Sequence, residues 1–144
     1  MIIDGALVST DWLDEHLDQA NLRIFDTTIY LRPKENGMGY RADSGRENWA
    51  AAHIPGAGFL DLAEEFADST TTIPFMMPTP ENFARGAAAH GINDDSLVVL
   101  YNDGMPMWAT RAWWMFRSIG FDNVVVLDGG WQKWQREGRT VTDT

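Results

Sequence analysis

The amino-acid sequence predicts an α/β domain built on a mostly parallel sheet. Two short runs, Leu97–Tyr101 and Val124–Leu127, are apolar at every position, which is typical of parallel strands that are buried on both faces. Helical patterns alternate with these and other strand-like runs, as they do in α/β domains. The 144 residues contain no internal repeat and no linker rich in Pro or Gly, so we expect a single domain over residues 1–144.

The expected elements of the first half already alternate between helix and strand. Apolar residues at helical spacing, with Ser9 or Thr10 as a cap, predict the first helix. In order, the elements are a helix over residues 11–17, a strand over 22–26, a polar loop containing Pro33, Gly37 and Gly39, a short helix over 44–52 and a short strand over 58–61.

The second half repeats this alternation around the two buried strands. Pro at the first helical position and Gly just after the last one are typical of helix boundaries. In order, the elements are a helix from Pro80 to a stop at Gly91, the strand Leu97–Tyr101, a loop over 102–107, a strongly apolar helix over 108–118 closed by Gly120, the strand Val124–Leu127 and a short helix over 131–136.

Composition excludes several classes of function. The formal net charge of −10 repels nucleic acid and anionic membrane surfaces. The chain has no Cys, and its three His have no ligand spacing, so we expect no disulfide, no thiolate chemistry, no metal and no cofactor. No apolar run approaches the roughly 20 residues of a membrane span, and residues 1–10 do not resemble a signal peptide. We therefore expect a cytoplasmic protein.

The loop after strand Leu97–Tyr101 is the first candidate site, because ligands of parallel sheets bind where strands lead into helices. Asn102 stands where a nucleophile would stand, although an amide is a poor one. Asp103 disfavours an anionic ligand, and Pro106 removes one main-chain amide. Three interpretations remain: a plain connection, which we favour; a small-anion site; and carboxylate chemistry at Asp103, which lacks an evident partner. The loop consists of Asn102, Asp103, Gly104, Met105, Pro106 and Met107.

Arg111 is the charged residue most expected to be buried, because it lies within the apolar helix. Buried charges are normally paired, so we expect Asp26 or Asp128 as its partner rather than a ligand. His53 is expected to be a hydrogen-bonded loop residue rather than a base. The spacing of four tryptophans favours packing over an aromatic cage: Trp113, Trp114, Trp131 and Trp134.

Two motifs resemble those of the rhodanese family. Residues 49–57 resemble its aromatic-x-x-x-His-aliphatic-Pro-Gly-Ala motif, with Trp in place of the usual Phe or Tyr; its structural positions are His53, Pro55 and Gly56. Residues 124–134 resemble the closing motif of the family, with Lys133 where Glu is usual; its structural positions are Asp128, Gly129 and Gly130.

Three further segments are similar to the first domain of tandem-domain thiosulfate and 3-mercaptopyruvate sulfurtransferases. These segments are residues 7–13, 76–83 and 101–114, the last of which contains Arg111. The order and spacing of three of these segments, residues 49–57, 101–114 and 124–134, agree with those of the rhodanese family. The resemblance implies the rhodanese fold, which is a mostly parallel five-stranded sheet with helices on both faces.

The resemblance also implies which half of such a protein this chain is. In catalytic rhodanese domains, a Cys after the central strand carries sulfane sulfur as a persulfide. Asn102 matches that position, so the loop would be vestigial and the chain inactive by itself. The resemblance then implies an N-terminal half whose partner is a second, catalytic rhodanese domain of the same chain, with this half forming one wall of the cleft. Its exposed apolar surface predicts self-association when it is isolated.

The whole protein would transfer sulfur from thiosulfate or 3-mercaptopyruvate to cyanide or a thiol. Mercaptopyruvate-type relatives have an Asp and a His at two positions that match Ala63 and Phe75 here, which favours thiosulfate or another sulfur donor that has not been tested. The alternative hypothesis is a free-standing, inactive rhodanese module that binds a protein partner or a small anion. The two hypotheses differ in whether the natural chain continues past Thr144.

Overall fold

The central feature of the fold is a five-stranded parallel sheet. The computed structural model describes residues 5–71 and 75–144. The strand order is β1-β7-β6-β2-β5, and all four neighbouring pairs are parallel. The strands are β1 (Leu7–Val8), β2 (Leu22–Asp26), β5 (Gly58–Phe59), β6 (Leu97–Tyr101) and β7 (Val124–Leu127). The predicted fold class is confirmed.

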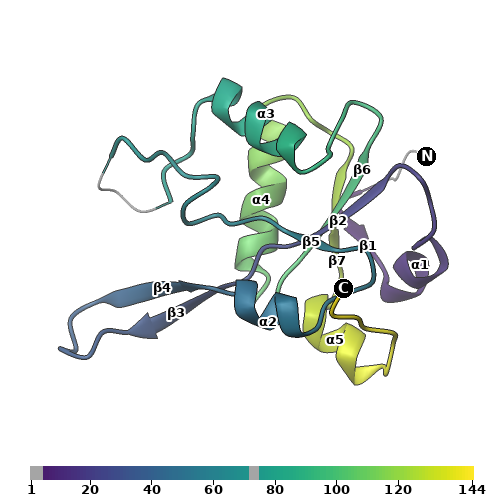
Figure 1. Cartoon of the computed structure of the whole chain (residues 1–144), viewed down its shortest axis with the longest axis horizontal. Coiled ribbons are helices and arrows are strands. Elements are labelled where there is room, and N and C mark those ends of the chain that lie inside the picture. The colour runs from purple at the N-terminus through teal and green to yellow at the C-terminus, as the bar shows by residue number, and fades with distance from the viewer. Residues whose placement is uncertain (1–4, 72–74) are drawn as a thin grey trace.

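Helices cover both faces of this sheet (Figure 1). On one side lie α3 (Pro80–Ala89) and α4 (Met107–Ser118), and on the other lie α1 (Thr10–Glu15) and α5 (Gly130–Arg136). A fifth helix, α2 (Arg46–Ala51), leads toward β5. None of the helices in the described part of the chain is long and apolar enough to cross a membrane.

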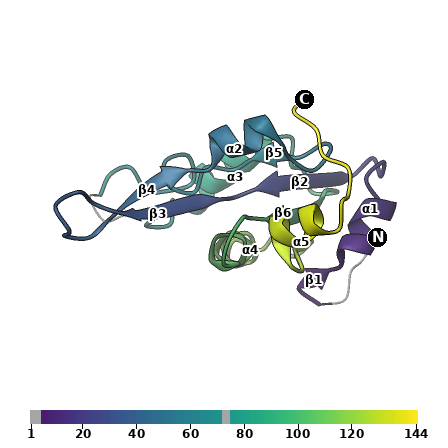
Figure 2. The ribbon, with the colours of Figure 1, turned by 90° about the horizontal axis from the view of Figure 1, so that it is seen from below.

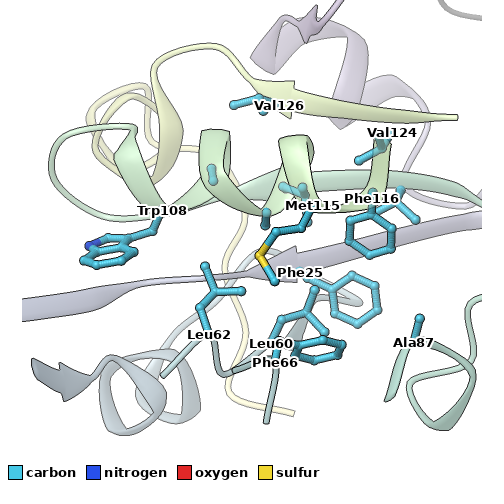
Figure 3. Packing of buried hydrophobic residues seen from close by; sticks show 14 of the residues in the cluster. Phe25, Leu60, Leu62, Phe66, Ala87, Trp108, Met115, Phe116, Val124 and Val126 are labelled. Carbon is cyan, nitrogen blue, oxygen red and sulfur yellow. The ribbon is translucent and has the colours of Figure 1, made fainter. Parts of the chain in front are cut away.

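Successive side chains of the central strands point to opposite faces of the sheet, and this divides the core into two clusters. In β6, Val98 and Leu100 pack toward α3 and α4, whereas Leu97, Val99 and Tyr101 pack toward α1 and α5. Figure 3 shows the first cluster, where Met115 and Phe116 of α4 meet the aromatic and aliphatic side chains below them. Every residue of β6 is fully buried, as the continuous apolar run predicted.

The polar loop expected after β2 is a β-hairpin, and this prediction was wrong. β3 (Ile29–Pro33) pairs antiparallel with β4 (Tyr40–Ser44) over five residue pairs. Figure 2 shows the hairpin extending away from the body of the domain. Both of its faces are largely exposed, so the sequence lacks the apolar–polar alternation that marks a half-buried strand. Its tip uses Gly37 and Gly39, both at positive φ.

The other predicted elements exist, with ends that differ by a few residues. The first helix is capped by Ser9, whose hydroxyl accepts a hydrogen bond from the Trp12 amide, and it ends at Glu15 rather than Leu17. The helix expected over 44–52 is α2, and the strand expected over 58–61 is shortened to β5. Thr79 caps α3, and Gly91 follows it at positive φ, as predicted.

The chain leaves β2 through a buried turn at Asp26. One Asp26 carboxylate oxygen accepts hydrogen bonds from the Thr28 amide (2.8 Å) and the Thr28 hydroxyl (2.5 Å). Asp26 is only 6% exposed, and this burial raises its pKa to about 6 against the opposing effect of the Thr28 hydrogen bonds. The folded protein therefore binds this proton more tightly than the unfolded chain does.

This difference predicts a pH dependence of stability that Asp26→Asn removes. The contribution of Asp26 to the free energy of unfolding is fully present below about pH 4 and is lost as pH rises through about 6. At about 1.4 kcal/mol per pKa unit, the wild type should lose on the order of 2–3 kcal/mol relative to Asp26→Asn across this window. Urea unfolding at a series of pH values measures the difference.

Asp68 provides a matched control, because it makes the same pair of bonds on the surface. Its carboxylate accepts from the Thr70 amide (2.9 Å) and hydroxyl (2.6 Å), and these bonds lower its pKa. The pH dependence of the free energy of unfolding should therefore have the opposite sign here: relative to Asp68→Asn, the wild type should lose stability as pH falls. Parallel pH profiles for the wild type and Asp26→Asn would contradict the assignment.

Candidate functional site

The candidate loop lies between β6 and α4, and the side chain of Asn102 fills its centre. Asn102 is 3% exposed. Its Nδ2 donates to the main-chain oxygens of Asp103 (2.9 Å) and Met105 (2.7 Å). Its Oδ1 accepts from the Ala109 amide (3.0 Å), which is one of the unpaired amides in the first turn of α4. Pro106, at the N-cap, offers no side-chain bond, so Asn102 caps the helix from across the loop.

These contacts determine the polarity of the loop interior. Two main-chain oxygens point inward at the amide of Asn102, whereas an anion or thiolate would require inward N–H groups. The space that such a ligand would occupy is taken by the side chain. The position expected for a nucleophile therefore holds a fully hydrogen-bonded amide, and this geometry does not favour a small anion inside the loop.

Asp103 is tied to the base of the hairpin. Its amide donates to the Thr28 hydroxyl (2.9 Å), and its carboxylate accepts from the Tyr30 hydroxyl (2.9 Å). Tyr30 in turn accepts from the Asn48 side chain (2.9 Å), and burial together with the carboxylate of Asp103 raises the pKa of its hydroxyl. Asp103 thus has a structural partner, which weakens the case for carboxylate chemistry.

The closing motif, residues 124–134, contacts the loop on the side opposite the hairpin. Gly130 lies at φ +58°, and a Cβ there would stand 2.6 Å from the Asn102 main-chain oxygen. That oxygen accepts from the Trp131 amide (3.2 Å), so only glycine permits this close approach. Gln132 adds a hydrogen bond to the Gly104 oxygen (2.9 Å). A hollow of about 280 Å³ remains between the two segments, with Asp128 at its lining.

The motif that contains His53 lies beneath the loop rather than in it. The Ile54 amide donates to the Tyr101 hydroxyl (3.3 Å), one residue before Asn102. Gly56 adopts φ +85° next to Pro55, which turns the chain into β5. His53 is 2% exposed and hydrogen-bonded through both ring nitrogens, so the expectation of a hydrogen-bonded residue is confirmed.

Arg111 does not pair with Asp26 or Asp128, and this prediction was wrong. Its guanidinium is partly exposed and donates to the main-chain oxygen of Phe75. Phe75 is the one non-glycine residue at positive φ among those described, and its ring packs on Trp108 at 4.9 Å. Asp26 is satisfied by Thr28 instead, so the arginine has no buried carboxylate to neutralise.

Apolar side chains surround the outer face of the loop. Met105 is 80% exposed and Trp114 is 52% exposed, and they line an open depression of about 570 Å³. Trp113 and Trp134 instead donate to main-chain oxygens, and Trp131 stacks on Tyr101, so the four tryptophans form no cage. We call the exposed apolar residues of this depression the apolar patch: Met105, Met107 and Trp114.

Sequence reasoning located the loop but missed the residues that support it. Thr28 and Tyr30 reach the loop from an element that was expected to be an irregular loop, and Gln132 reaches it from α5. The Asp-x-Thr pattern at residues 26–28 is the one local signal that could have indicated the turn. No group of His, Asp and Glu in the described part of the chain could hold a metal ion.

Comparison with known proteins identifies several sulfurtransferases to which this chain is similar. Thiosulfate/3-mercaptopyruvate sulfurtransferase 2 of Arabidopsis thaliana is 41% identical over 136 residues, which are 94% of this chain and 37% of that protein. The 3-mercaptopyruvate sulfurtransferase of Escherichia coli K12 is 36% identical over 130 residues, which are 90% of this chain and 44% of that protein. Thiosulfate sulfurtransferase of Gallus gallus is 38% identical, covering 95% of this chain and 46% of that protein.

The chain therefore spans less than half the length of these relatives. Among solved structures, SseA from Escherichia coli, described as a 3-mercaptopyruvate sulfotransferase with the rhodanese fold, matches with a TM-score of 0.83 and 33% identity. The match covers 96% of this chain and 50% of that one. A family model described as a rhodanese-like domain matches residues 9–137. The chain thus belongs to the rhodanese family.

Proposed function

We propose that this chain is the non-catalytic half of a sulfurtransferase and forms one wall of a cleft whose sulfur-carrying Cys lies in a second domain. The observation that carries the proposal is Asn102: the position expected for the nucleophile holds an amide whose donors and acceptor are all engaged within the loop. A chain without Cys cannot form a persulfide, so sulfur transfer requires another domain.

The lengths and names of the relatives support a partner domain in the same polypeptide. The relatives are named as thiosulfate or 3-mercaptopyruvate sulfurtransferases, and this chain matches less than half of each. The whole protein would take sulfane sulfur from such a donor onto a Cys of the second domain and pass it to cyanide or a thiol. The apolar patch beside the loop is the surface on which we place that domain, because exposed apolar patches mark interaction sites.

The residues at positions 63 and 75 favour thiosulfate, or another sulfur donor that has not been tested, over 3-mercaptopyruvate. Phe75 packs on Trp108, and Ala63 packs partly buried against the same core cluster, so neither offers the charge that mercaptopyruvate-type relatives have at the matching positions. We keep the cytoplasmic location expected from the sequence as part of the proposal.

The alternative is a free-standing rhodanese module that binds a protein partner. The two hypotheses are separated by the natural protein: its intact mass and peptide sequencing past Thr144, followed by thiosulfate and 3-mercaptopyruvate assays on the whole protein. A second domain with a Cys after a buried strand supports the proposal. A natural chain that ends near Thr144 overturns it and leaves the binding module.

Asn102→Cys should not convert this chain into a sulfurtransferase. A thiolate at this position would face the main-chain oxygens of Asp103 and Met105, which destabilise an anion. The substitution should also lower the free energy of unfolding by roughly 2–4 kcal/mol, because the Ala109 amide loses its partner. Thiocyanate formation from thiosulfate and cyanide, with mass spectrometry for one added sulfur, measures the first effect, and urea unfolding measures the second.

Asn123→Ala is the matched control for stability. The side-chain amide of Asn123 donates a single hydrogen bond, to the main-chain oxygen of Ser96 (3.0 Å). Asn123→Ala should lower the free energy of unfolding clearly less than Asn102→Cys does. A stable persulfide on Asn102→Cys, or equal losses for the two variants, would show that the polarity of the loop has been misjudged.

The apolar patch predicts that the isolated chain self-associates. Trp114→Lys should shift the chain toward monomer. Trp114 is 52% exposed, and a charged side chain at this position would disrupt apolar contact between two copies of the patch. Sedimentation velocity over a tenfold or greater range of protein concentration measures the shift. Met38→Lys is the control, since Met38 is 75% exposed at the hairpin tip, away from the patch. A wild type that is monomeric at all concentrations refutes the prediction.

A further inference from the structure

The segment after α5 returns across the domain and pairs with the chain at His53. Figures 1 and 2 show this segment ending near α2 and β5. The His53 amide donates to the Thr142 oxygen (2.8 Å), and the Thr142 amide donates to the His53 oxygen (2.9 Å). These two bonds form an antiparallel bridge between residues 89 positions apart in the sequence, so the end of the segment is held to the motif that follows α2.

The ring of His53 makes two more contacts, and both are with oxygens that can only accept. Nδ1 lies 2.6 Å from the main-chain oxygen of Trp49, and Nε2 lies 3.0 Å from that of Thr144. A neutral imidazole has one N–H donor and one lone pair, so it can satisfy only one of these oxygens. The doubly protonated ring satisfies both. His53 is 2% exposed and stacks on Trp49, so its ring has little access to water.

The groups around His53 are compatible with a positive ring. Asp26 of β2 interacts electrostatically with it, and the positive ring favours the charged form of that buried carboxyl. Tyr101 of β6 contributes a hydroxyl that accepts from the Ile54 amide. The charged residues of α2, Arg46 and Glu47, are exposed, as is Asp143 on the returning segment. In this chain by itself, the Thr144 oxygen belongs to the terminal carboxylate, whose negative charge also favours a positive ring.

We propose that His53 is a proton-linked anchor that holds the end of the returning segment against α2. With both ring nitrogens protonated, His53 holds Thr144 beside α2. When one proton is lost, a nitrogen lone pair faces a main-chain oxygen, and the contact at Thr144 is released. The anchor is a property of this chain alone, whereas its consequence for the placement of a second domain rests on the proposed function.

The release is confined to the last few residues, because the segment is anchored independently before them. The Trp134 indole donates to the Thr140 oxygen (2.9 Å). Arg139 pairs with Asp11, Asp14 and Glu137, and these carboxylates raise the pKa of its guanidinium. The chain therefore stays attached up to Thr140 whatever the state of His53. The two main-chain bonds between Thr142 and His53 do not involve the ring, but without the neighbouring contact at Thr144 this bridge opens more often.

The sequence contains a matched pair that isolates the second ring contact. His16 follows Trp12 by four residues, as His53 follows Trp49, and its Nδ1 lies 2.6 Å from the Trp12 oxygen. The two rings stack with centroids 4.2 Å apart. In the described part of the chain, no main-chain oxygen is hydrogen-bonded to Nε2 of His16. His16 thus shares the local arrangement of His53 without the link to the returning segment.

Hydrogen exchange and ring ¹⁵N shifts of the wild type test the anchor. Between about pH 5 and pH 8, a range that spans an imidazole titration, the protection of the Thr142 amide should fall by about tenfold after correction for intrinsic rates, because a charge-assisted hydrogen bond is lost. The ¹⁵N shifts of His53 should report a doubly protonated ring at the lower pH. The Leu100 amide, in the buried strand β6, is the internal reference.

Two variants make the test specific. His53→Gln keeps a donor toward Thr144 but does not titrate, so the protection of Thr142 should become independent of pH. His16→Gln should retain the pH dependence of the wild type. A singly protonated His53 at about pH 5 with Thr142 still protected, or loss of the pH dependence in His16→Gln, overturns the proposal. These measurements use this chain by itself, so their outcome is distinct from whether a catalytic domain follows it.

Discussion

The arrangement of the site depends on one side-chain amide inside one loop. Asn102 connects the end of β6, the loop itself and the first turn of α4 through three hydrogen bonds from a nearly inaccessible position. A buried amide is stable only when its donors and acceptor are all satisfied, and here the loop closes around it to do so. The same contacts that stabilise the loop direct its carbonyl groups inward. The stability of the loop and the inward direction of its carbonyl groups thus have a single origin.

The surrounding elements are arranged to hold that loop in place. On one side, the hairpin base contributes Thr28 and Tyr30 to Asp103; on the other, the closing motif brings its main chain against the Asn102 oxygen. The second contact requires a glycine at position 130, because any Cβ would meet the oxygen. The loop uses the polar groups of Asn102 and Asp103 internally, because each is hydrogen-bonded within the loop or to a neighbouring element.

Sequence patterns predicted the parts of the fold that are governed by burial. The runs in β6 and β7 lie between two helical layers, so each of their positions had to be apolar. The hairpin could not be predicted in this way, since its two faces meet solvent and no alternation is required. Arg111 shows a different limit: its partner is a main-chain oxygen 36 residues away, and a carbonyl group has no sequence signature.

Contacts of Asp26 link the loop to His53 and so to the returning segment after α5. Asp26 shares the hydroxyl of Thr28 with the Asp103 amide, and it also interacts electrostatically with His53. A proton on Asp26 or on His53 therefore changes the electrostatic environment of the other, over a distance that burial leaves poorly screened. One end of this chain of contacts holds the loop, and the other holds the returning segment. The buried polar residues Asp26, Thr28, His53 and Asn102 thus satisfy one another or nearby main-chain groups within an otherwise apolar core, as buried polar groups must.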